Sequence, residues 1–177
     1  MGYEISGALG VKYANPDRDV YAMVGDGSFL MLHSELISAV QEHKKINVVL
    51  FNNASFGCIN NLQVGHGNET LCTELRYRGE DGKHSGNFMP IDFAKVAEGY
   101  GCKAYTVNTM EELYAAIKDA KTVENVPVLF DIRVLPKSMT EGYGSWWRCG
   151  DVEVSERSEQ LKVYEDHLAH ERAARKY

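Results

Sequence analysis

Four short apolar stretches alternate with segments of helix length, and this alternation constrains the fold more than any other feature. Each stretch has the length and composition of a buried strand, and together they occupy residues 20–24, 46–51, 102–107 and 128–134. Strands joined through helices form right-handed crossover connections, which place the strands parallel in one sheet. A parallel sheet carries helices on its faces. The sequence therefore predicts an α/β fold with a doubly wound, mostly parallel sheet and helices on both faces.

Helical periodicity fills the segments between these strands. We expect a helix with small residues on one face over 2–14, a second over 29–43 and a third over 92–100. The first ends at Asn15 and Pro16, because the residue before a proline avoids helical geometry.

A capping box predicts the start of a further helix. Thr109 and Glu112 have the spacing at which a threonine hydroxyl and a glutamate carboxylate accept hydrogen bonds from each other's free backbone amides. We expect this helix to bury Met110, Leu113 and Ile117.

Two regions lie outside the alternation. Residues 65–89 are polar and aperiodic, which predicts a long loop of the kind that acts as a lid or is disordered. A charged helix is expected near the C-terminus, with Leu161 and Leu168 on one side. We therefore expect a domain over 1–150 and a C-terminal helical extension over 151–177.

Composition limits the functions open to the chain. Its 177 residues suit one domain, and a net charge of −6 with scattered basic residues argues against a nucleic-acid-binding surface. No stretch approaches the roughly 20 apolar residues of a membrane span, and the first residues lack a signal-peptide pattern. The four cysteines show no C-x-x-C pairing, which favours free thiols in a reducing compartment. These features predict a cytoplasmic protein.

Polar residues follow the first two strands at the point where each strand ends. Gly25, Asp26, Gly27 and Ser28 follow the first strand, and the pair at 52–53 follows the second after an interval of 24 residues. One helix and one strand fill that interval, so both motifs return to the carboxyl edge of the sheet, where ligands of such sheets bind. Carboxylate and amide oxygens suit Mg²⁺, and a glycine beside a helix start suits a phosphate.

Each of these motifs also has a purely structural interpretation. Asp-Gly and Asn-Asn are both common turns, and either one alone would indicate no more than a turn. Their combination, each directly after an apolar strand, favours a site for magnesium and a diphosphate.

The two motifs resemble the cofactor signature of the thiamine-diphosphate enzymes, the superfamily of acetohydroxyacid synthase and pyruvate decarboxylase. The resemblance runs from Met1 to about Val134. It implies that the Asp26 and Asn53 side chains and the Ser55 backbone carbonyl ligate magnesium.

The same resemblance assigns residues to thiamine diphosphate. Gly25, Asp26, Gly27 and Ser28 would hold its diphosphate, together with the turn at 53–55. Met1 matches the bulky residue that supports the cofactor in its bent, reactive form.

Within the superfamily, further features look most like the trihydroxycyclohexane-1,2-dione hydrolases of myo-inositol catabolism. They are residues 53–59, the polar loop, and the Gly-Tyr-Gly-Ser-Trp-Trp stretch at 142–147. The resemblance implies hydrolysis of a carbon–carbon bond in a cyclic polyol dione, 3,5/4-trihydroxycyclohexane-1,2-dione, to 5-deoxy-glucuronate. Alternatives are an acetolactate synthase-like enzyme, a 2-oxo acid decarboxylase or carboligase, and a non-catalytic assembly subunit.

The family's cofactor-activating glutamate has no counterpart in this sequence. The resemblance implies that an N-terminal pyrimidine-binding domain, usually that of a partner subunit, supplies it. We therefore expect a C-terminal fragment of a longer homodimeric or homotetrameric enzyme, with no catalytic residue of its own and no activity alone.

Other polar residues are open to two interpretations. Asn60 and Gln63 could bind a polyhydroxylated substrate or be solvated. We expect Glu74 and Arg76 to be solvated loop residues, and His167 to lie on a solvated helix face.

Overall fold

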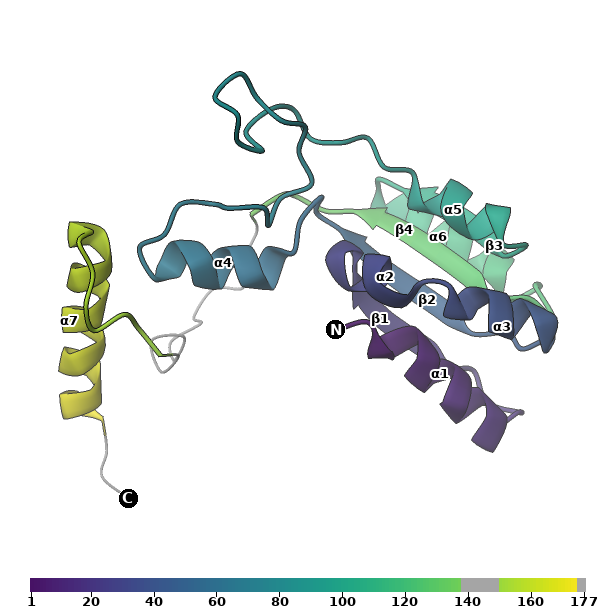
Figure 1. Ribbon diagram of the computed structural model, residues 1–177. Helices are drawn as coiled ribbons and strands as arrows, with labels where there is room; N and C mark the ends of the chain where they lie inside the picture. The colour runs from purple at the N-terminus through teal and green to yellow at the C-terminus, as the bar shows by residue number, and fades with distance from the viewer. Residues whose placement is uncertain (138–149, 175–177) are drawn as a thin grey trace.

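The computed structural model describes residues 1–137 and 150–174, and within these ranges it contains one four-stranded sheet (Figure 1). In spatial order the strands are β1 (Tyr21–Gly25), β2 (Asn47–Asn52), β4 (Val128–Arg133) and β3 (Lys103–Val107). All three neighbouring pairs are parallel. The predicted α/β fold with a parallel sheet is confirmed.

The helices of the described residues connect these strands or follow them. They are α1 (Tyr3–Ala14), α2 (Asp26–Leu32), α3 (Glu35–Gln41), α4 (Gly57–Gly65), α5 (Phe93–Gly99), α6 (Met110–Ala120) and α7 (Ser158–Ala173). None of these helices combines the length and the apolar character that a membrane crossing requires.

One face of the sheet carries the larger core. Helices α1, α2, α3 and α5 lie on this face, in front of the strands in Figure 1. Val48 and Leu50 of β2 are fully buried against apolar side chains such as Phe29, Leu36 and Phe93. Burial of this apolar area is the main favourable contribution to folding.

The opposite face is covered only over β3 and β4, where α6 packs. Ala116 and Ala120 of α6 are buried in a second cluster with Val128 and Phe130. Over the other half of this face, β1 and β2 expose apolar side chains, including those of Tyr21, Met23 and Phe51. Helices therefore lie on both faces, as predicted, although within the described residues those on the second face leave β1 and β2 uncovered.

The packing of α6 corrects part of its predicted buried face. Met110 is 55% exposed and Ile117 is 37% exposed, so their predicted burial is wrong. The helix contacts the sheet through its small alanine side chains, and Leu113 is only partly buried. The capping box is confirmed, since Glu112 N donates to Thr109 Oγ1 at 3.2 Å and Thr109 N donates to the Glu112 carboxylate.

Two helical predictions around the cofactor motifs needed correction. The helix expected over 29–43 is two helices, α2 and α3, separated at His33, whose ring stacks on Phe29 and Tyr100. The first of them begins at Asp26. Helix α4 was not predicted, because its sequence has weak amphipathic periodicity and its N-cap, Phe56, provides no side-chain cap.

The region predicted as a long loop has no helix or extended strand beyond α4, which ends at Gly65. Isolated bridges pair Ser55 with Glu74 and Arg76 with Phe88. The loop is therefore fastened to the turn after β2 by backbone hydrogen bonds.

Helix α7 contacts the residues directly after α4 (Figure 1). Asp151, whose side chain is 2% exposed, pairs with His66 at 3.1 Å and with His167 at 2.9 Å. The prediction that His167 lies on a solvated face is wrong, because an acidic residue before the helix folds back onto it. The proposed division at residue 150 stays a prediction.

Candidate cofactor and metal site

Asp26 lies where β1 ends and α2 begins, and its side chain is fully buried. One carboxylate oxygen, Oδ1, accepts a hydrogen bond from Gly27 N at 2.7 Å. The other, Oδ2, accepts one from Ser55 N at 3.1 Å. The carboxylate therefore joins the two motifs that the sequence placed at one edge.

The sheet register explains this meeting. β1 and β2 are adjacent and parallel, with Gly25 opposite Phe51, so both strands end at the same edge. The residues that follow, Asp26 and the turn at 53–55, leave the sheet side by side. This is the carboxyl edge at which ligands of open parallel sheets bind.

The turn after β2 has an unusual backbone. Ala54 has a φ of 56°, in the left-handed region that residues with a Cβ seldom adopt. In this conformation the amide of the next residue, Ser55, faces Asp26. Ser55 Oγ also donates to Asn53 Oδ1 at 2.9 Å, which fixes the amide side chain within the turn.

The charge of Asp26 is the strongest indication that a cation belongs here. Burial raises the pKa of Asp26, while hydrogen bonds from the Gly27 and Ser55 amides act in the opposite direction. Across residues 1–137 and 150–174, no cationic side chain forms an ion pair with this carboxylate. A buried carboxylate without a counter-charge is unfavourable, and a bound cation would provide the missing charge.

The donor set fits a hard cation. The described part of the chain holds no cluster of three His, Cys, Asp or Glu side chains able to ligate a metal. A metal at this edge would therefore combine the Asp26 carboxylate with neutral oxygens of Asn53 and Ser55. Such all-oxygen sets, completed by phosphate oxygens, suit Mg²⁺.

Gly27 has a packing role that the sequence did not reveal. A Cβ at this position would lie 2.5 Å from the Phe56 ring. The sequence assigned Gly27 to close approach of a phosphate, and the structure adds that the Phe56 ring also occupies the space beside it. Phe56 thereby connects the end of β1 to the start of α4.

The Ser28 hydroxyl is already used within the protein. It accepts a hydrogen bond from Gly2 N at 2.8 Å and donates one to Glu4 Oε1 at 2.7 Å. Ser28 therefore fastens the start of α1 to α2, and neither Gly2 nor Glu4 carried a sequence signal for this role. Met1, directly before this contact, is 61% exposed.

Asp131 is a second buried carboxylate that the sequence analysis missed. It lies inside β4, is fully buried, and accepts a hydrogen bond from Asn52 Nδ2 at 2.8 Å. The sequence feature that could have revealed Asp131 is an aspartate in the middle of an apolar strand, because burial of a charge is costly unless it has partners.

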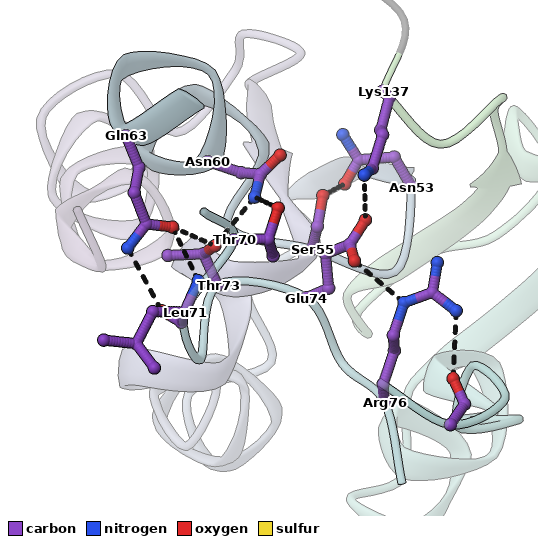
Figure 2. Close-up of polar contacts among 11 residues, drawn as sticks. Asn53, Ser55, Asn60, Gln63, Thr70, Leu71, Thr73, Glu74, Arg76 and Lys137 are labelled. Atoms are coloured by element: carbon purple, nitrogen blue, oxygen red, sulfur yellow. Dashed lines mark hydrogen bonds and ion pairs between the residues drawn. The ribbon is translucent and has the colours of Figure 1, made fainter. Parts of the chain in front are cut away.

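The loop residues beside the turn are buried rather than solvated. Backbone hydrogen bonds from Phe56 N to Thr73 O and from Leu75 N to Ala54 O, both 2.8 Å, hold the loop against the turn. Glu74 is 8% exposed, and Figure 2 shows it beside Ser55 with Arg76 and Lys137.

The Glu74 carboxylate contacts both cations, with Arg76 Nε at 2.8 Å and Lys137 Nζ at 3.4 Å. The predicted solvation of Glu74 is wrong and Arg76 is only 23% exposed, because these two side chains fold inward against the turn.

The polar side chains expected to be available to a polyol substrate are engaged within the protein. Figure 2 shows Asn60 donating to Thr70 and Thr73, at 3.0 and 2.9 Å. Gln63 bonds the backbone of Leu71 and the hydroxyl of Thr73. These groups fasten the loop to α4, so they do not support a polyol substrate.

The sequence of this site matches a known family. Residues 1–132 match the family described as "Thiamine pyrophosphate enzyme, C-terminal TPP binding domain". The chain belongs to this family. Membership places the buried Asp26 and the 53–55 turn in a thiamine-pyrophosphate-binding domain.

Relatives of this thiamine-pyrophosphate-binding domain are longer proteins. The chain is 55% identical over its whole length to "3D-(3,5/4)-trihydroxycyclohexane-1,2-dione hydrolase" of Clostridium perfringens (strain 13 / Type A) and covers 28% of that protein. It is 56% identical to the protein of the same name from Geobacillus thermodenitrificans, again over all of this chain and 28% of the relative. The chain thus spans little more than a quarter of the relatives it matches.

A solved structure has the same fold. The thiamine diphosphate-dependent 4-hydroxybenzoylformate decarboxylase of Rhodococcus jostii RHA1 superposes with a TM-score of 0.62 and is 28% identical. The match covers 78% of the present chain and 24% of the decarboxylase chain. The residues outside the described ranges include the stretch at 142–147 that contributed to the predicted resemblance.

Proposed function

We propose that this chain is the C-terminal cofactor-binding part of a thiamine-diphosphate-dependent enzyme that hydrolyses a carbon–carbon bond of 3D-(3,5/4)-trihydroxycyclohexane-1,2-dione. Two relatives that carry this name are 55% and 56% identical over the entire chain. The product would be an open-chain deoxy-uronate, 5-deoxy-glucuronate, in the breakdown of myo-inositol. The observation that carries the cofactor part of the proposal is the buried Asp26 carboxylate bonded to the 53–55 turn.

The residues of the site have separate parts in this proposal. Asp26, the Asn53 side chain and the Ser55 carbonyl would ligate Mg²⁺, and the metal would neutralise the buried carboxylate. The backbone at Gly25, Gly27 and Ser28 would hold the diphosphate. The hydroxyl of Ser28 is engaged with Gly2 and Glu4, so its contribution would come from the backbone.

Thiamine diphosphate, when bound, supplies the electron sink for cleavage of the substrate's carbon–carbon bond. The protein residues would hold and orient the cofactor, and Met1 would support its bent, reactive form. The activating glutamate would come from the N-terminal pyrimidine-binding domain of the same enzyme in a partner subunit. We propose that the enzyme is a homodimer or homotetramer. We also propose that it lies in the cytoplasm, because the free thiols of Cys58, Cys72 and Cys102 favour a reducing compartment.

The test of the reaction uses the full-length enzyme, thiamine diphosphate and Mg²⁺, and offers the cyclic dione and pyruvate in separate assays. We expect hydrolysis of the dione with little acetolactate. Efficient acetolactate formation with the dione left intact would overturn the substrate while leaving the cofactor site in place. The 177-residue chain alone should turn over neither compound, and turnover by it would place the missing catalytic base within this chain.

The test of the cofactor site is a binding measurement. Intrinsic fluorescence of the full-length protein is followed during titration with thiamine diphosphate, with and without Mg²⁺. Saturable quenching that needs the metal is the expected result. An unchanged signal under all conditions would favour a non-catalytic assembly subunit.

A further inference from the structure

A chain of buried hydrogen bonds leads from the core to the turn at 53–55. Asp131 Oδ1 accepts from Asn52 Nδ2 at 2.8 Å. The other end of the same amide group, Asn52 Oδ1, accepts from the backbone N of Ala54 at 3.2 Å. Asp131 and Asn52 are 0% and 4% exposed, so water does not compete for these bonds. One side chain of β4 is thereby connected to the backbone that follows β2.

The link ends at the strained position of the turn. Ala54 has the left-handed φ of 56°, which is unfavourable for a residue with a Cβ and persists where surrounding contacts hold it. The backbone N of Ala54 donates to Asn52 Oδ1 at 3.2 Å and also interacts with the Asp26 carboxylate, and Leu75 N donates to the Ala54 carbonyl at 2.8 Å. The Asn52 bond is therefore one of the interactions that select this conformation.

The conformation of Ala54 decides where the two neighbouring residues point. Before Ala54, the side-chain oxygen Oδ1 of Asn53 accepts a hydrogen bond from the Ser55 hydroxyl at 2.9 Å. After Ala54, the backbone N of Ser55 donates a hydrogen bond to the Asp26 carboxylate at 3.1 Å. If Ala54 relaxed to a right-handed or extended conformation, Asn53 and Ser55 would turn away from Asp26.

Strand pairing by itself does not need the Asp131 side chain. The backbone of β2 pairs with β4 from Asn47 to Asn52, and Val134 N continues the ladder by donating to Asn52 O at 3.0 Å. A carboxylate inside an apolar strand is costly, and Arg133 Nη2, 3.0 Å from Oδ2, offsets its charge. Beyond strand pairing, the carboxylate orients the Asn52 amide group, and it also contacts Arg133 and the backbone amide of Phe93.

We propose that Asp131 is a positioning residue for the metal-binding turn, acting through the Asn52 side chain on the backbone of Ala54. Asp131 itself touches neither metal nor cofactor in this proposal. It fixes the amide group of Asn52, the amide group holds the left-handed Ala54, and Ala54 directs Asn53 and Ser55 toward Asp26. The proposal rests on the function proposed above, in which these residues ligate Mg²⁺.

The test measures the Mg²⁺ concentration for half-maximal binding of thiamine diphosphate by the full-length protein, followed by fluorescence quenching. Asp131→Val removes the acceptor and leaves Asn52 Nδ2 unpaired, and we expect this concentration to rise by about tenfold or more. Asp131→Asn keeps an oxygen that can accept from Asn52. Its Mg²⁺ concentration for half-maximal binding should stay within about threefold of the native value.

A rescue variant separates positioning from general destabilisation. Glycine adopts a positive φ readily, so adding Ala54→Gly to Asp131→Val should restore much of the Mg²⁺ affinity. Phe130→Leu is the matched control, because Phe130 neighbours Asp131 in β4 but packs on the opposite face with Tyr105. It should leave the Mg²⁺ dependence unchanged.

The outcomes distinguish the two proposals. If the native protein shows no Mg²⁺-dependent binding, the proposed function fails. If the native protein binds and Asp131→Val binds equally well, only the positioning role fails. An equal loss in Phe130→Leu, or no rescue by Ala54→Gly, would also overturn it. Should Asp131→Val not fold, Asn52→Ala, with and without Ala54→Gly, provides the same comparison.

Discussion

The backbone amide of Ser55 donates a hydrogen bond to the carboxylate of Asp26, at 3.1 Å across 29 positions of sequence. This bond unites the ends of β1 and β2 and places the only charged group of the proposed metal site against a backbone turn. The Asp26 side chain is fully buried there, and burial raises its pKa. The pair has direct consequences for substitution of Asp26.

Asp26→Asn should remove the effect of the ligands on stability. In the absence of metal, removal of the buried charge is stabilising, but the new amide NH2 group replaces an oxygen that accepts from Gly27 N or Ser55 N, so the melting temperature should change little. In the presence of Mg²⁺ and thiamine diphosphate, the large stabilisation expected of the native protein should be lost. Thermal unfolding with and without both ligands measures this. Asp17→Asn, at an exposed aspartate, is the control and should behave like the native protein. If Mg²⁺ stabilised Asp26→Asn as much as it stabilises the native protein, Asp26 would not be a metal ligand.

Gly27→Ala should disturb the site through Phe56. The added Cβ would lie 2.5 Å from the Phe56 ring, so the ring and the turn before it must move. We expect a loss of about 1–3 kcal/mol in the free energy of unfolding, as is typical of overpacking, and weaker binding of the cofactor. Denaturant unfolding and fluorescence titration measure the two effects.

Two further variants control the Gly27 experiment. Phe56→Leu added to Gly27→Ala should recover part of the stability by opening space. Gly10→Ala, where a Cβ meets nothing within 4 Å on helix α1, should raise stability by about 0.5–1 kcal/mol. A neutral Gly27→Ala would show that the ring yields without cost.

Thr109→Ala should weaken α6 without affecting the cofactor site. The Thr109 hydroxyl accepts from Glu112 N at 3.2 Å, and loss of such a cap costs about 1 kcal/mol. Thr109→Ser keeps the hydroxyl and should retain most of the stability. Urea unfolding compares the three proteins, and a cost in Thr109→Ser equal to that in Thr109→Ala would contradict the capping role.

The cysteines should differ in their reactivity toward alkylating agents. Burial raises the pKa of Cys102 to about 11, so at pH 8 only about one thiol in a thousand is the reactive thiolate. Because so little thiolate is present at pH 8, Cys102 in the folded protein should resist iodoacetamide. Its thiolate fraction, and with it the reaction rate, should fall further as the pH is lowered. The exposed Cys58 and Cys72 should be modified first.

Peptide mass spectrometry after timed alkylation measures these rates. The same protein in urea is the control, and there Cys102 should react as readily as Cys58 and Cys72. Modification of Cys102 at the rate of Cys72 in the folded protein would show that its surroundings open to solvent.

Much of the fold could be predicted because its signals are local. The alternation of apolar strands and helical segments was sufficient for a parallel sheet, and the Thr109–Glu112 box needed only residues three apart. Local signals failed where neighbours far along the chain decide the outcome. His33 interrupts the helix expected over 29–43 while it stacks on Tyr100, and Asp151 folds back to bury His167.

The sequence by itself determined that Asp26 and the 53–55 turn reach one edge of the sheet, because the carboxyl ends of adjacent parallel strands must meet there. Only the tertiary structure decided how the turn is held. The left-handed Ala54, the Asn52–Asp131 hydrogen bond and the inward Glu74 depend on groups that β4 and the loop bring from distant positions. Sequence periodicity reports which face of an element is apolar. It carries no information on which polar groups will be buried together, since that depends on how the elements pack.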